Sequence, residues 1–508
     1  MTTNNSLYIA RNGRDESYID GQLSNVRIVK GTAVYTSSFK PPTEPLTNIT
    51  NTTLLCCNDS STTGKTVGPT ITANNSPTAS TDSPFYDSSC AVFGPNEDQD
   101  VIKCGSYVGN NSNDGPHIPL GFEPQFLMVK CSTANENWEM YDNMRGVVDN
   151  SVNNDDAYLK PNANSSETLN NRLRFTATGF QPTTASGVIN DPQTYIYIAI
   201  RRPDGYVGKP PELGTSVFNM GLGQNSTTIP NYISGFPVDM GIHRLPASTS
   251  FPVFVTRLMG PKYLRTDTAD AEASGSWATF DSNTGYITNQ QDNTHQAWMW
   301  KRHAGFDVCT WTGDGVQGRQ IPHSLSKSPE MIWVKTRSQS SQNWMVGHKG
   351  LNGGTNPWEK YINLNTDGSE NDYPVWNDQA PTSTHFAVSS IAQTNASSET
   401  YVAMLFASVD GISKVGYYAG SGSTQTITTG FQPRFLIVKV IDNQLPWYVL
   451  DTTRGWAAGN DSYLQLNDNA AQVTNFDFGA PTATGFTMQG GAAANNESGL
   501  NYIYYAHA

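Results

Sequence analysis

A ten-residue pattern recurs along this chain and limits the folds that the chain can adopt. Its two clearest copies, GFEPQFLMVK at 121–130 and GFQPRFLIVK at 430–439, agree at seven of ten positions and begin 309 residues apart. A third copy, SPEMIWVK, lies at 328–335, and a divergent one, GFPVDMGI, lies at 235–242. Copies spaced by about 100 residues predict four tandem domains that share one plan.

Further landmarks follow each copy of the pattern in the same order. A strand with a large apolar residue and then a glycine turn come first, followed by a tyrosine strand, a strand with a Thr-x-aromatic pattern and an apolar closing strand. The landmark residues, in that order, are Trp138, Val253, Trp344 and Trp447; Gly146, Gly260, Gly350 and Gly455; Tyr158, Tyr263, Tyr361 and Tyr463; and Phe180, Tyr286, Phe386 and Phe486. The closing strands are predicted at 194–200, 295–300, 400–407 and 501–508.

The predicted fold class is all-β, with tandem β-sandwich or jelly-roll-like domains. Helical periodicity is missing, whereas apolar runs such as 435–438 have the length of strands and are bounded by turn residues. Each repeat has room for about seven or eight strands in two sheets, with the Trp and Phe landmarks facing inward. The predicted boundaries are 1–95 for an N-terminal segment that breaks the pattern, then 96–206, 207–304 (divergent), 305–410 and 411–508 for repeats 1 to 4.

Composition excludes some classes of partner. The net charge of -13, with 31 basic against 44 acidic residues, does not provide the basic field that nucleic acid requires. No apolar run approaches the length of a membrane span, so no membrane insertion is expected. Residues 1–5 have neither a basic region nor an apolar core, so we expect no secretory signal and synthesis in a reducing cytoplasm.

The cysteines do not recur with the repeats, which argues against a disulfide framework. The six are Cys56, Cys57, Cys90, Cys104, Cys131 and Cys309. We expect them to act as small buried apolar side chains rather than as metal or redox groups. Cys56 and Cys57 are adjacent on a predicted strand and should point to opposite faces.

No catalytic, cofactor-binding or metal-binding residues are predicted. Glycoside hydrolysis needs two carboxylates across a cleft, but Glu123, Asp239 and Glu330 occupy edge or turn positions that favour solvated side chains. His323 and His348 are expected at turns or the surface, without a Gly-x-Ser-x-Gly motif. The acidic turns at 153–156 and 370–372 could hold calcium but match no known ligand spacing.

Aromatic residues in loops are the strongest sign of a binding function. Their positions, beside Gly, Asn, Pro or Ser, are Trp277, Trp358, Trp376 and Trp456. Aromatic rings in such places can stack on sugar faces, so these four residues are candidates for glycan binding. Packing at the sandwich rims or between consecutive repeats is the competing explanation.

The N-terminal segment departs from the repeat. Residues 17–35 (SYIDGQLSNVRIVKGTAVY) lead into a proline-rich bend at 39–45. This stretch resembles the closing half of a concanavalin A-like (laminin G-type) sandwich over residues 6 to about 85. The opening strands of that family do not precede it, so the four repeats, a neighbouring chain or a symmetry-related copy is expected to complete the sandwich.

The same segment, with its PPTEPL tail at 41–46, resembles structural proteins of marine bacteriophages, especially phages of cyanobacteria. The repeats resemble an uncharacterised β domain of such virion proteins. The likeness is clearest in repeat 3, through FDVCTWTG at 306–313, IPHSL at 321–325 and YVAMLFA at 401–407. The resemblance implies a fibre-like component of the tail or virion surface, with no established catalytic residues.

The resulting expectation is a non-enzymatic tail fibre or tail appendage that displays β domains for attachment to host-surface polysaccharide. A capsid or tail decoration protein and a polysaccharide depolymerase are the alternatives. Expected partners are further copies of the chain, as a trimer or higher oligomer, and other virion tail or capsid proteins. No cofactor is expected. The chain contains neither a heptad run nor a collagen-like tract, which favours a compact appendage over a long thin fibre.

Overall fold

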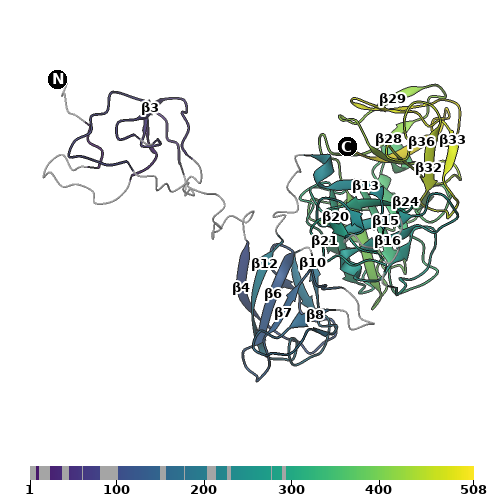
Figure 1. Ribbon diagram of the computed structural model, residues 1–508, viewed down its shortest axis with the longest axis horizontal. Coiled ribbons are helices and arrows are strands. Elements are labelled where there is room, and N and C mark those ends of the chain that lie inside the picture. Colours follow the sequence, from purple (N-terminus) through teal and green to yellow (C-terminus); the bar gives the residue numbers. More distant parts are fainter. Residues whose placement is uncertain are drawn as a thin grey trace. The chain divides into compact units, whose positions relative to one another are not determined.

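The computed structural model describes residues 7–10, 23–36, 45–59, 61–79, 101–148, 156–176, 178–202, 213–225, 230–275, 277–288 and 293–508. The chain divides into two compact units, Met1–Val92 and Phe93–Ala508 (Figure 1). The predicted all-β class is confirmed, since the described residues form antiparallel sheets with only short 3-10 helices. These helices are η2 (Gly214–Ser216), η3 (Arg257–Met259), η4 (Leu351–Gly354) and η5 (Pro357–Glu359).

The first unit contains a three-stranded antiparallel sheet with the order β1-β2-β3. Its strands are β1 (Val26–Val29), β2 (Thr52–Cys56) and β3 (Lys65–Val67). Leu54, Leu55 and Cys56 are buried, whereas most of the proline-rich bend predicted at 39–45 lies outside the described residues. The sheet agrees with an all-β segment, and its concanavalin A-like character stays a prediction.

The second unit contains four sets of strands, each within one predicted repeat. Repeat 1 has β4 (Ile102–Val108), β5 (Ile118–Pro119), β6 (Pro124–Cys131), β7 (Glu139–Asp142), β8 (Ala157–Leu159), β9 (Thr168–Leu169), β10 (Leu173–Thr176), β11 (Gly179–Pro182) and β12 (Thr194–Arg201). Repeat 2 has β13 (Phe218–Leu222), β14 (Tyr232–Ile233), β15 (Met240–Arg244), β16 (Val253–Thr256), β17 (Leu264–Arg265), β18 (Gly285–Tyr286) and β19 (Gln296–Trp300).

Repeat 3 has β20 (Phe306–Thr312), β21 (Arg319–Pro322), β22 (Met331–Thr336), β23 (Met345–His348), β24 (Lys360–Asn363), β25 (Asn371–Asp372), β26 (His385–Val388) and β27 (Thr400–Phe406). Repeat 4 has β28 (Ser413–Ala419), β29 (Gln425–Thr428), β30 (Phe435–Val440), β31 (Tyr448–Asp451), β32 (Asp461–Gln465), β33 (Val473–Phe476), β34 (Pro481–Thr482), β35 (Gly485–Met488) and β36 (Asn501–His507). The predicted closing strands correspond to β12, β19, β27 and β36.

All four repeats share one topology. A large sheet has the order β4-β12-β6-β7-β8-β9 in repeat 1, β13-β19-β15-β16-β17 in repeat 2, β20-β27-β22-β23-β24-β25 in repeat 3 and β28-β36-β30-β31-β32-β33 in repeat 4. The closing strand therefore lies between the first strand and the strand of the recurring pattern. A small sheet of two or three strands completes each sandwich.

The register of the large sheets is also the same in the four repeats. One row of directly paired residues crosses each sheet, and we call it the cross-strand row. Its members are Cys104, Ile198, Met128, Met140 and Leu159 in repeat 1; Met220, Trp298, Ile242, Phe254 and Leu264 in repeat 2; Val308, Met404, Trp333, Val346 and Ile362 in repeat 3; and Val415, Tyr505, Ile437, Val449 and Leu464 in repeat 4. The tandem repetition predicted from the sequence is therefore visible residue by residue.

Each sandwich has its own core between its two sheets. The aromatic landmarks Phe180, Tyr286, Phe386 and Phe486 lie in these four cores and are buried. They stand on the small sheets and point toward the large ones, as the Thr-x-aromatic pattern predicts. Each such ring, once fully buried, contributes about 1.5–3 kcal/mol to the free energy of folding.

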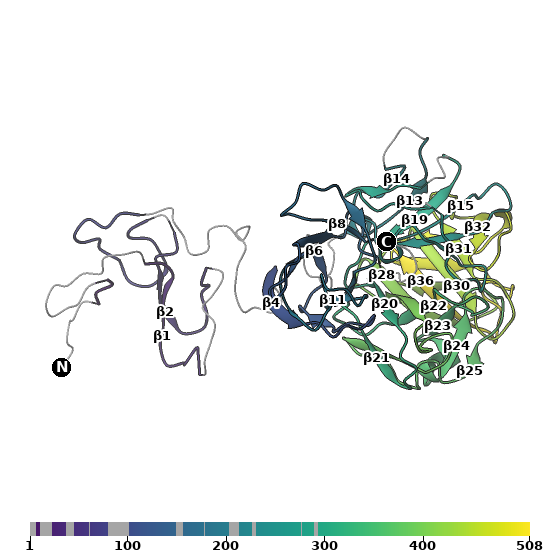
Figure 2. The same ribbon diagram turned by 90° about the horizontal axis from the view of Figure 1, so that it is seen from below.

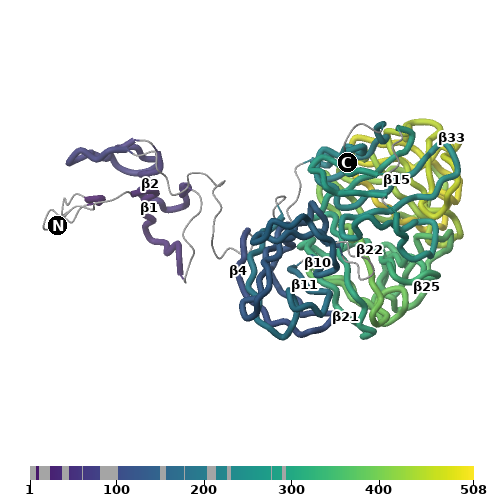
Figure 3. Tube along the Cα trace, turned by 60° about the horizontal axis from the view of Figure 1, so that its bottom comes forward, coloured from purple at the N-terminus to yellow at the C-terminus, as the bar shows by residue number. Residues whose placement is uncertain are grey.

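A second core lies on the opposite, outer faces of the large sheets. The cross-strand rows of repeats 2, 3 and 4 meet there in one continuous apolar cluster. Figure 2 shows β22, β28, β30 and β36 in the interior of this unit, with β14 and β21 at its periphery, and Figure 3 shows the yellow trace of repeat 4 packed against repeats 2 and 3. The sequence interpretation was wrong for Trp344 and Trp447, because both fill this shared core rather than their own sandwiches.

Three hydrogen bonds close repeats 2, 3 and 4 into a ring. Trp344 donates to the carbonyl of Arg265 at 3.0 Å, and Trp447 donates to that of Asn363 at 2.9 Å. Arg244 donates to the carbonyl of Gln465 at 2.7 Å. The three acceptors occupy the same place, two residues after the tyrosine of the tyrosine strand. Each repeat therefore donates to one neighbour and accepts from the other, as in a cyclic trimer.

The cysteines follow the expectation only in part. Cys56, Cys131 and Cys309 are buried, Cys104 is exposed on β4, and Cys90 lies outside the described residues. Burial raises the pKa of Cys56 to about 11. The two adjacent thiols do not point apart as predicted, since their sulfur atoms are 3.8 Å from each other. Cys57 has a φ of 58°, which ends the strand and turns its side chain back.

Among the described residues, no helix has both the length and the apolar character needed to cross a membrane.

Candidate functional site

Three of the four predicted glycan-binding tryptophans are buried in sandwich cores. Trp358 and Trp376 pack edge to face in repeat 3 with their ring centroids 6.1 Å apart, and they are 8% and 1% exposed. Trp456 is 2% exposed in repeat 4, where its Nε1 donates to the carbonyl of Gly479 at 2.9 Å. A sugar ring needs an open aromatic face for stacking, so these three residues provide core packing instead.

Trp277 differs from the other three because its ring is only partly buried. It packs against Tyr263 and Phe251, at centroid distances of 5.2 and 5.9 Å, in the core of repeat 2. Its remaining surface lines a cavity of about 250 Å³. Trp277 is therefore the predicted residue that the structure places at a cavity.

The wall of this cavity combines aromatic rings with hydrogen-bonding groups. Besides Trp277 it contains His243, Arg244, Leu245, Thr249, Ser250, Phe251, Val253 and His295. Burial and the neighbouring His295 lower the pKa of His243 to about 3, so its imidazole is neutral at physiological pH. Tyr286 lies 3.3 Å from His243 Nδ1. When the tyrosine donates this bond, Nε2 carries the ring proton and has no acceptor among the described residues.

A second cavity, of about 230 Å³, lies between repeats 1 and 3. Its cationic side chains already have partners in the protein. Arg174 donates to Thr312 and Gln181, both at 2.6 Å, and Arg319 donates to the carbonyl of Thr312 at 2.5 Å. Burial, followed by the charge of Arg174, lowers the pKa of His117. The arrangement joins the two repeats and leaves little capacity for an anionic ligand.

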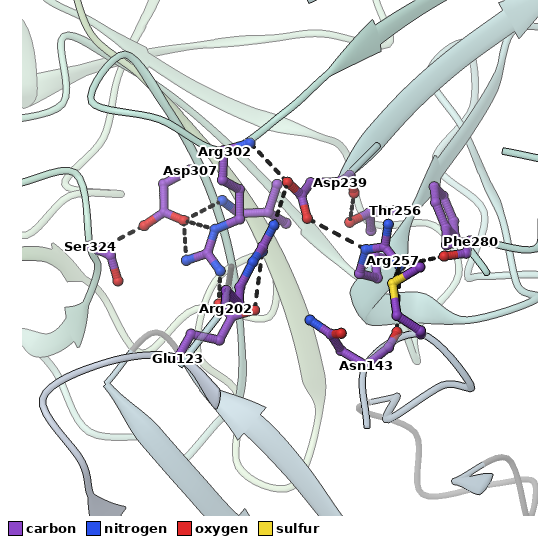
Figure 4. Close-up of polar contacts among 12 residues, drawn as sticks. Glu123, Asn143, Arg202, Asp239, Thr256, Arg257, Phe280, Arg302, Asp307 and Ser324 are labelled. Carbon is purple, nitrogen blue, oxygen red and sulfur yellow. Dashed lines mark hydrogen bonds and ion pairs between the residues drawn. The ribbon is translucent and has the colours of Figure 1, made fainter. Parts of the chain in front are cut away.

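The densest group of charged side chains is a buried network where repeats 1, 2 and 3 meet (Figure 4). It contains three carboxylates and three guanidinium groups, namely Glu123, Asp239, Asp307, Arg202, Arg257 and Arg302. Glu123 precedes β6, Asp239 precedes β15, and Asp307 lies in β20. The formal charges cancel, and every side chain is nearly inaccessible to solvent.

Arg202 and Arg302 connect the members of this network. Arg202 lies 2.9 Å from Asp239 and 3.3 Å from Glu123, while Arg302 pairs with both Glu123 and Asp307. Burial alone would raise the pKa of Asp239, but the charges of Arg202 and Arg257 outweigh it and hold that pKa below its usual value. Asp239 therefore stays ionised, and all three carboxylates contact arginines. The network therefore fixes the relative positions of three repeats.

The sequence interpretation of several polar residues was wrong. Glu123 and Asp239 were expected to be solvated, and His323 and His348 were expected at turns or the surface, yet all four are buried. Their partners are distant in the sequence, so no local pattern reveals them. A partial signal was available, because the position of Asp239 is also acidic in repeat 3, where Glu330 pairs with Lys349 at 2.6 Å.

The two acidic turns considered for calcium have other roles where they are described. Asp156 is buried and accepts hydrogen bonds from the backbone N–H groups of Val148, Arg172 and Leu173. Asp372 pairs with Lys360 at 2.9 Å. Residues 153–155 lie outside the described ranges. Within those ranges, no group of three or more His, Cys, Asp or Glu side chains is arranged to hold a metal ion.

Comparisons with known proteins assign the chain to a family but not to a function. No curated protein matches the chain, and no solved structure matches it. One family, described as a domain of unknown function (DUF7483), matches residues 25–202 and 260–508. The unmatched stretch between them covers about the first half of repeat 2, which contains the divergent copy of the pattern. Since the match includes most of the chain, the protein belongs to the DUF7483 family.

Proposed function

We propose that this protein is a non-enzymatic structural protein of a bacteriophage virion, a tail fibre or tail appendage whose β domains contact host-surface glycans. The observation that carries the proposal is the fusion of repeats 2, 3 and 4 into one body by the shared outer-face core. Such a body holds its loops in fixed positions around a rigid centre. This suits display and adhesion, in which several surface loops must keep their places relative to one another.

The chemistry of the buried carboxylates supports a non-enzymatic role. Glu123, Asp239 and Asp307 are the closest approach to the paired acids of a glycosidase, yet each contacts at least one arginine and is closed to solvent. A general acid needs a carboxyl whose pKa is raised toward neutrality, whereas the pKa of Asp239 is lowered. A substrate has no route to these groups in the described structure.

Glycan contact is assigned to the cavity of repeat 2. Trp277 supplies an apolar ring, and the neutral His243, Ser250 and Thr249 supply groups that can exchange hydrogen bonds with sugar hydroxyls. A cavity of about 250 Å³ is close to the lower end of ligand sites, which start at about 300 Å³. It is suited to a single sugar unit at the end or branch of a polysaccharide.

The location of the chain on virions tests the first part of the proposal. Immunogold labelling should place the chain at the tail, and quantitative mass spectrometry of purified particles should give a small multiple of three or six copies. Hundreds of copies on the capsid would instead identify a decoration protein. Absence of the chain from particles would overturn the proposal.

Glycan binding is tested separately on an array of host polysaccharides. Trp277→Ala should abolish binding, whereas Tyr373→Ala, which removes an exposed aromatic ring of repeat 3, should leave it unchanged. Equal binding by the Trp277 variant and the unmodified chain would reject the cavity as the site. Release of reducing ends from the same glycans would favour the depolymerase alternative.

A further inference from the structure

The outer face of the large sheet of repeat 1 has the composition of its counterparts but not their burial. In repeats 2, 3 and 4 the cross-strand row is buried in the shared core. In repeat 1 the same row is Cys104, Ile198, Met128, Met140 and Leu159, and Cys104 is exposed while the other four are partly exposed. Beside it, Ile102, Ile196 and Leu169 are 38%, 40% and 53% exposed. An apolar sheet face of this extent marks an interaction surface.

Repeat 1 is attached to the rest of its unit through other surfaces. Arg174 on β10 contacts Thr312, and Glu123 at the start of β6 contacts Arg302. Asn143, after β7, accepts a hydrogen bond from Arg257. These contacts come from the small sheet and from one end of the large sheet. The outer face is therefore left open by the residues of this unit that the structure describes.

Repeat 1 also holds its landmark tryptophan as repeats 3 and 4 do. In all three repeats an asparagine lies four residues after the tyrosine of the tyrosine strand. Its side-chain oxygen accepts a hydrogen bond from the backbone N–H of the tryptophan. The pairs are Trp138 with Asn162 at 3.1 Å, Trp344 with Asn365 at 2.9 Å and Trp447 with Asn467 at 2.8 Å. Trp344 and Trp447 then donate across a boundary between repeats, while Trp138 stays partly exposed.

The basic residue that ends the recurring pattern also forms a hydrogen bond across a boundary between repeats in repeats 3 and 4, but not in repeat 1. Lys335 donates to the carbonyl of Ala269 in repeat 2, and Lys439 donates to that of Asp367 in repeat 3. Lys130 is the equivalent residue of repeat 1, and it donates to the carbonyls of Cys131 and Ala134 in the same repeat. Repeat 1 thus carries both side chains that bind a neighbouring repeat, on a face that the described residues of its own unit leave uncovered.

We propose that this face joins three copies of the chain through their first repeats. The chain itself indicates the occupant, because three sheets with this row already close into a ring as repeats 2, 3 and 4. The contacts that close it come from Trp344, Trp447 and, in repeat 2, Arg244. In a ring of three identical repeats, each outer face is covered by its neighbours and none stays exposed. In it, Trp138 of each copy donates to the carbonyl of Lys160 in the next copy. The proposal does not depend on a location on a virion.

The mass of the full-length chain in solution tests the proposal. Light scattering after size-exclusion chromatography should give three times the 55.4 kDa of one chain. Met128→Glu, which places a charge in the middle of the row, should give a single chain. Since Met128 is partly exposed within one chain, this variant should keep a cooperative thermal transition. Ile233→Glu adds the same charge at an exposed position of β14 and should remain trimeric.

Labelling of Cys104 gives a second measurement on the same proteins. Its counterparts Met220, Val308 and Val415 are buried in the shared core, so Cys104 should be protected from maleimide in the trimer. In Met128→Glu it should react at the rate of an exposed thiol. If the unmodified chain has the mass of a single chain or a dimer, the proposal is overturned. This holds even if Cys104 is protected from maleimide, because the N-terminal unit could then be what covers it. A trimer that survives Met128→Glu would also overturn it, since another surface would then hold the copies together.

Discussion

Trp447 of repeat 4 donates its indole N–H to the backbone carbonyl of Asn363 in repeat 3, at 2.9 Å. The ring is 1% exposed and belongs to the core that repeats 2, 3 and 4 share. A side chain that the sequence assigns to one domain therefore belongs to the boundary between two. The folding of these repeats is coupled through such residues.

Trp447→Ala should lower the free energy of unfolding by about 3–5 kcal/mol, because it leaves a cavity and an unpaired carbonyl in the shared core. Differential scanning calorimetry should show repeats 2 to 4 melting together at a lower temperature. Trp447→Phe, which keeps most of the ring volume, should have a smaller effect. If repeat 4 alone melted at a lower temperature while repeats 2 and 3 melted as before, this result would contradict the coupling.

Asp239→Asn should destabilise the junction of repeats 1, 2 and 3 by about 3–5 kcal/mol, since it removes a charged partner of the buried Arg202 and Arg257. Urea unfolding measures the change. Asp372→Asn removes one member of an exposed ion pair with Lys360 and serves as the control, with no measurable loss expected. Equal effects of the two substitutions would mean that the network does not hold the repeats together.

Acid should destabilise the protein below pH 6.5 because of its buried histidines. Burial lowers the pKa of His243, His348 and His507 to about 3, whereas in the unfolded chain they take up protons near pH 6.5. Between pH 6.5 and about 3 the unfolded state therefore binds more protons than the folded state. The free energy of unfolding falls by about 1.4 kcal/mol for each such group with every unit by which the pH is lowered.

His348→Gln should remove one of these contributions. Gly350 donates its backbone N–H to His348 Nδ1 at 2.9 Å, so a proton on that nitrogen has no place in the folded state. The slope of stability against pH between 6 and 4 should become shallower by about 1.4 kcal/mol per unit. Burial raises the pKa of Asp461 to about 6, which acts in the opposite direction, but this group is common to both proteins. An unchanged slope would show that His348 is not buried as a neutral ring.

Gly420→Ala should destabilise repeat 4 by about 1–3 kcal/mol through overpacking. A β-carbon at this position would lie 1.9 Å from the carbonyl oxygen of Glu497, and backbone cannot move aside as a flexible side chain can. Gly221→Ala is the matched control, since its β-carbon would meet no atom within 4 Å. Thermal melts of the two variants should differ clearly, and similar melting temperatures would argue against this close backbone approach.

The sequence alone predicts the order of the strands well, but not which face of a sheet is inside. The recurring pattern and the landmarks at Tyr361 and Phe386 locate β24 and β26, because turn residues and short apolar runs are local signals. Trp344 was assigned to the wrong core for a physical reason. Both faces of these large sheets are buried, so runs such as 435–438 are apolar at every position and show no alternation.

The site residues were harder to predict because their surroundings come from distant parts of the chain. Glu123 meets Arg302, a residue 179 positions away, and no local pattern distinguishes that buried acid from a solvated one. Trp277 and Trp376 both stand in loops beside small or polar residues, yet only the fold decides that Trp376 is covered and Trp277 lines a cavity.

The position of each closing strand has a kinetic consequence. Because β36 pairs with both β28 and β30, the first strand of the repeat cannot pair until β36, more than 80 residues later in the chain, is in place. Loops of this length are slow to close, and unpaired strand edges are open to aggregation during the delay. Refolding from denaturant should therefore be slow and sensitive to protein concentration, and production of the chain should benefit from chaperones that shield strand edges.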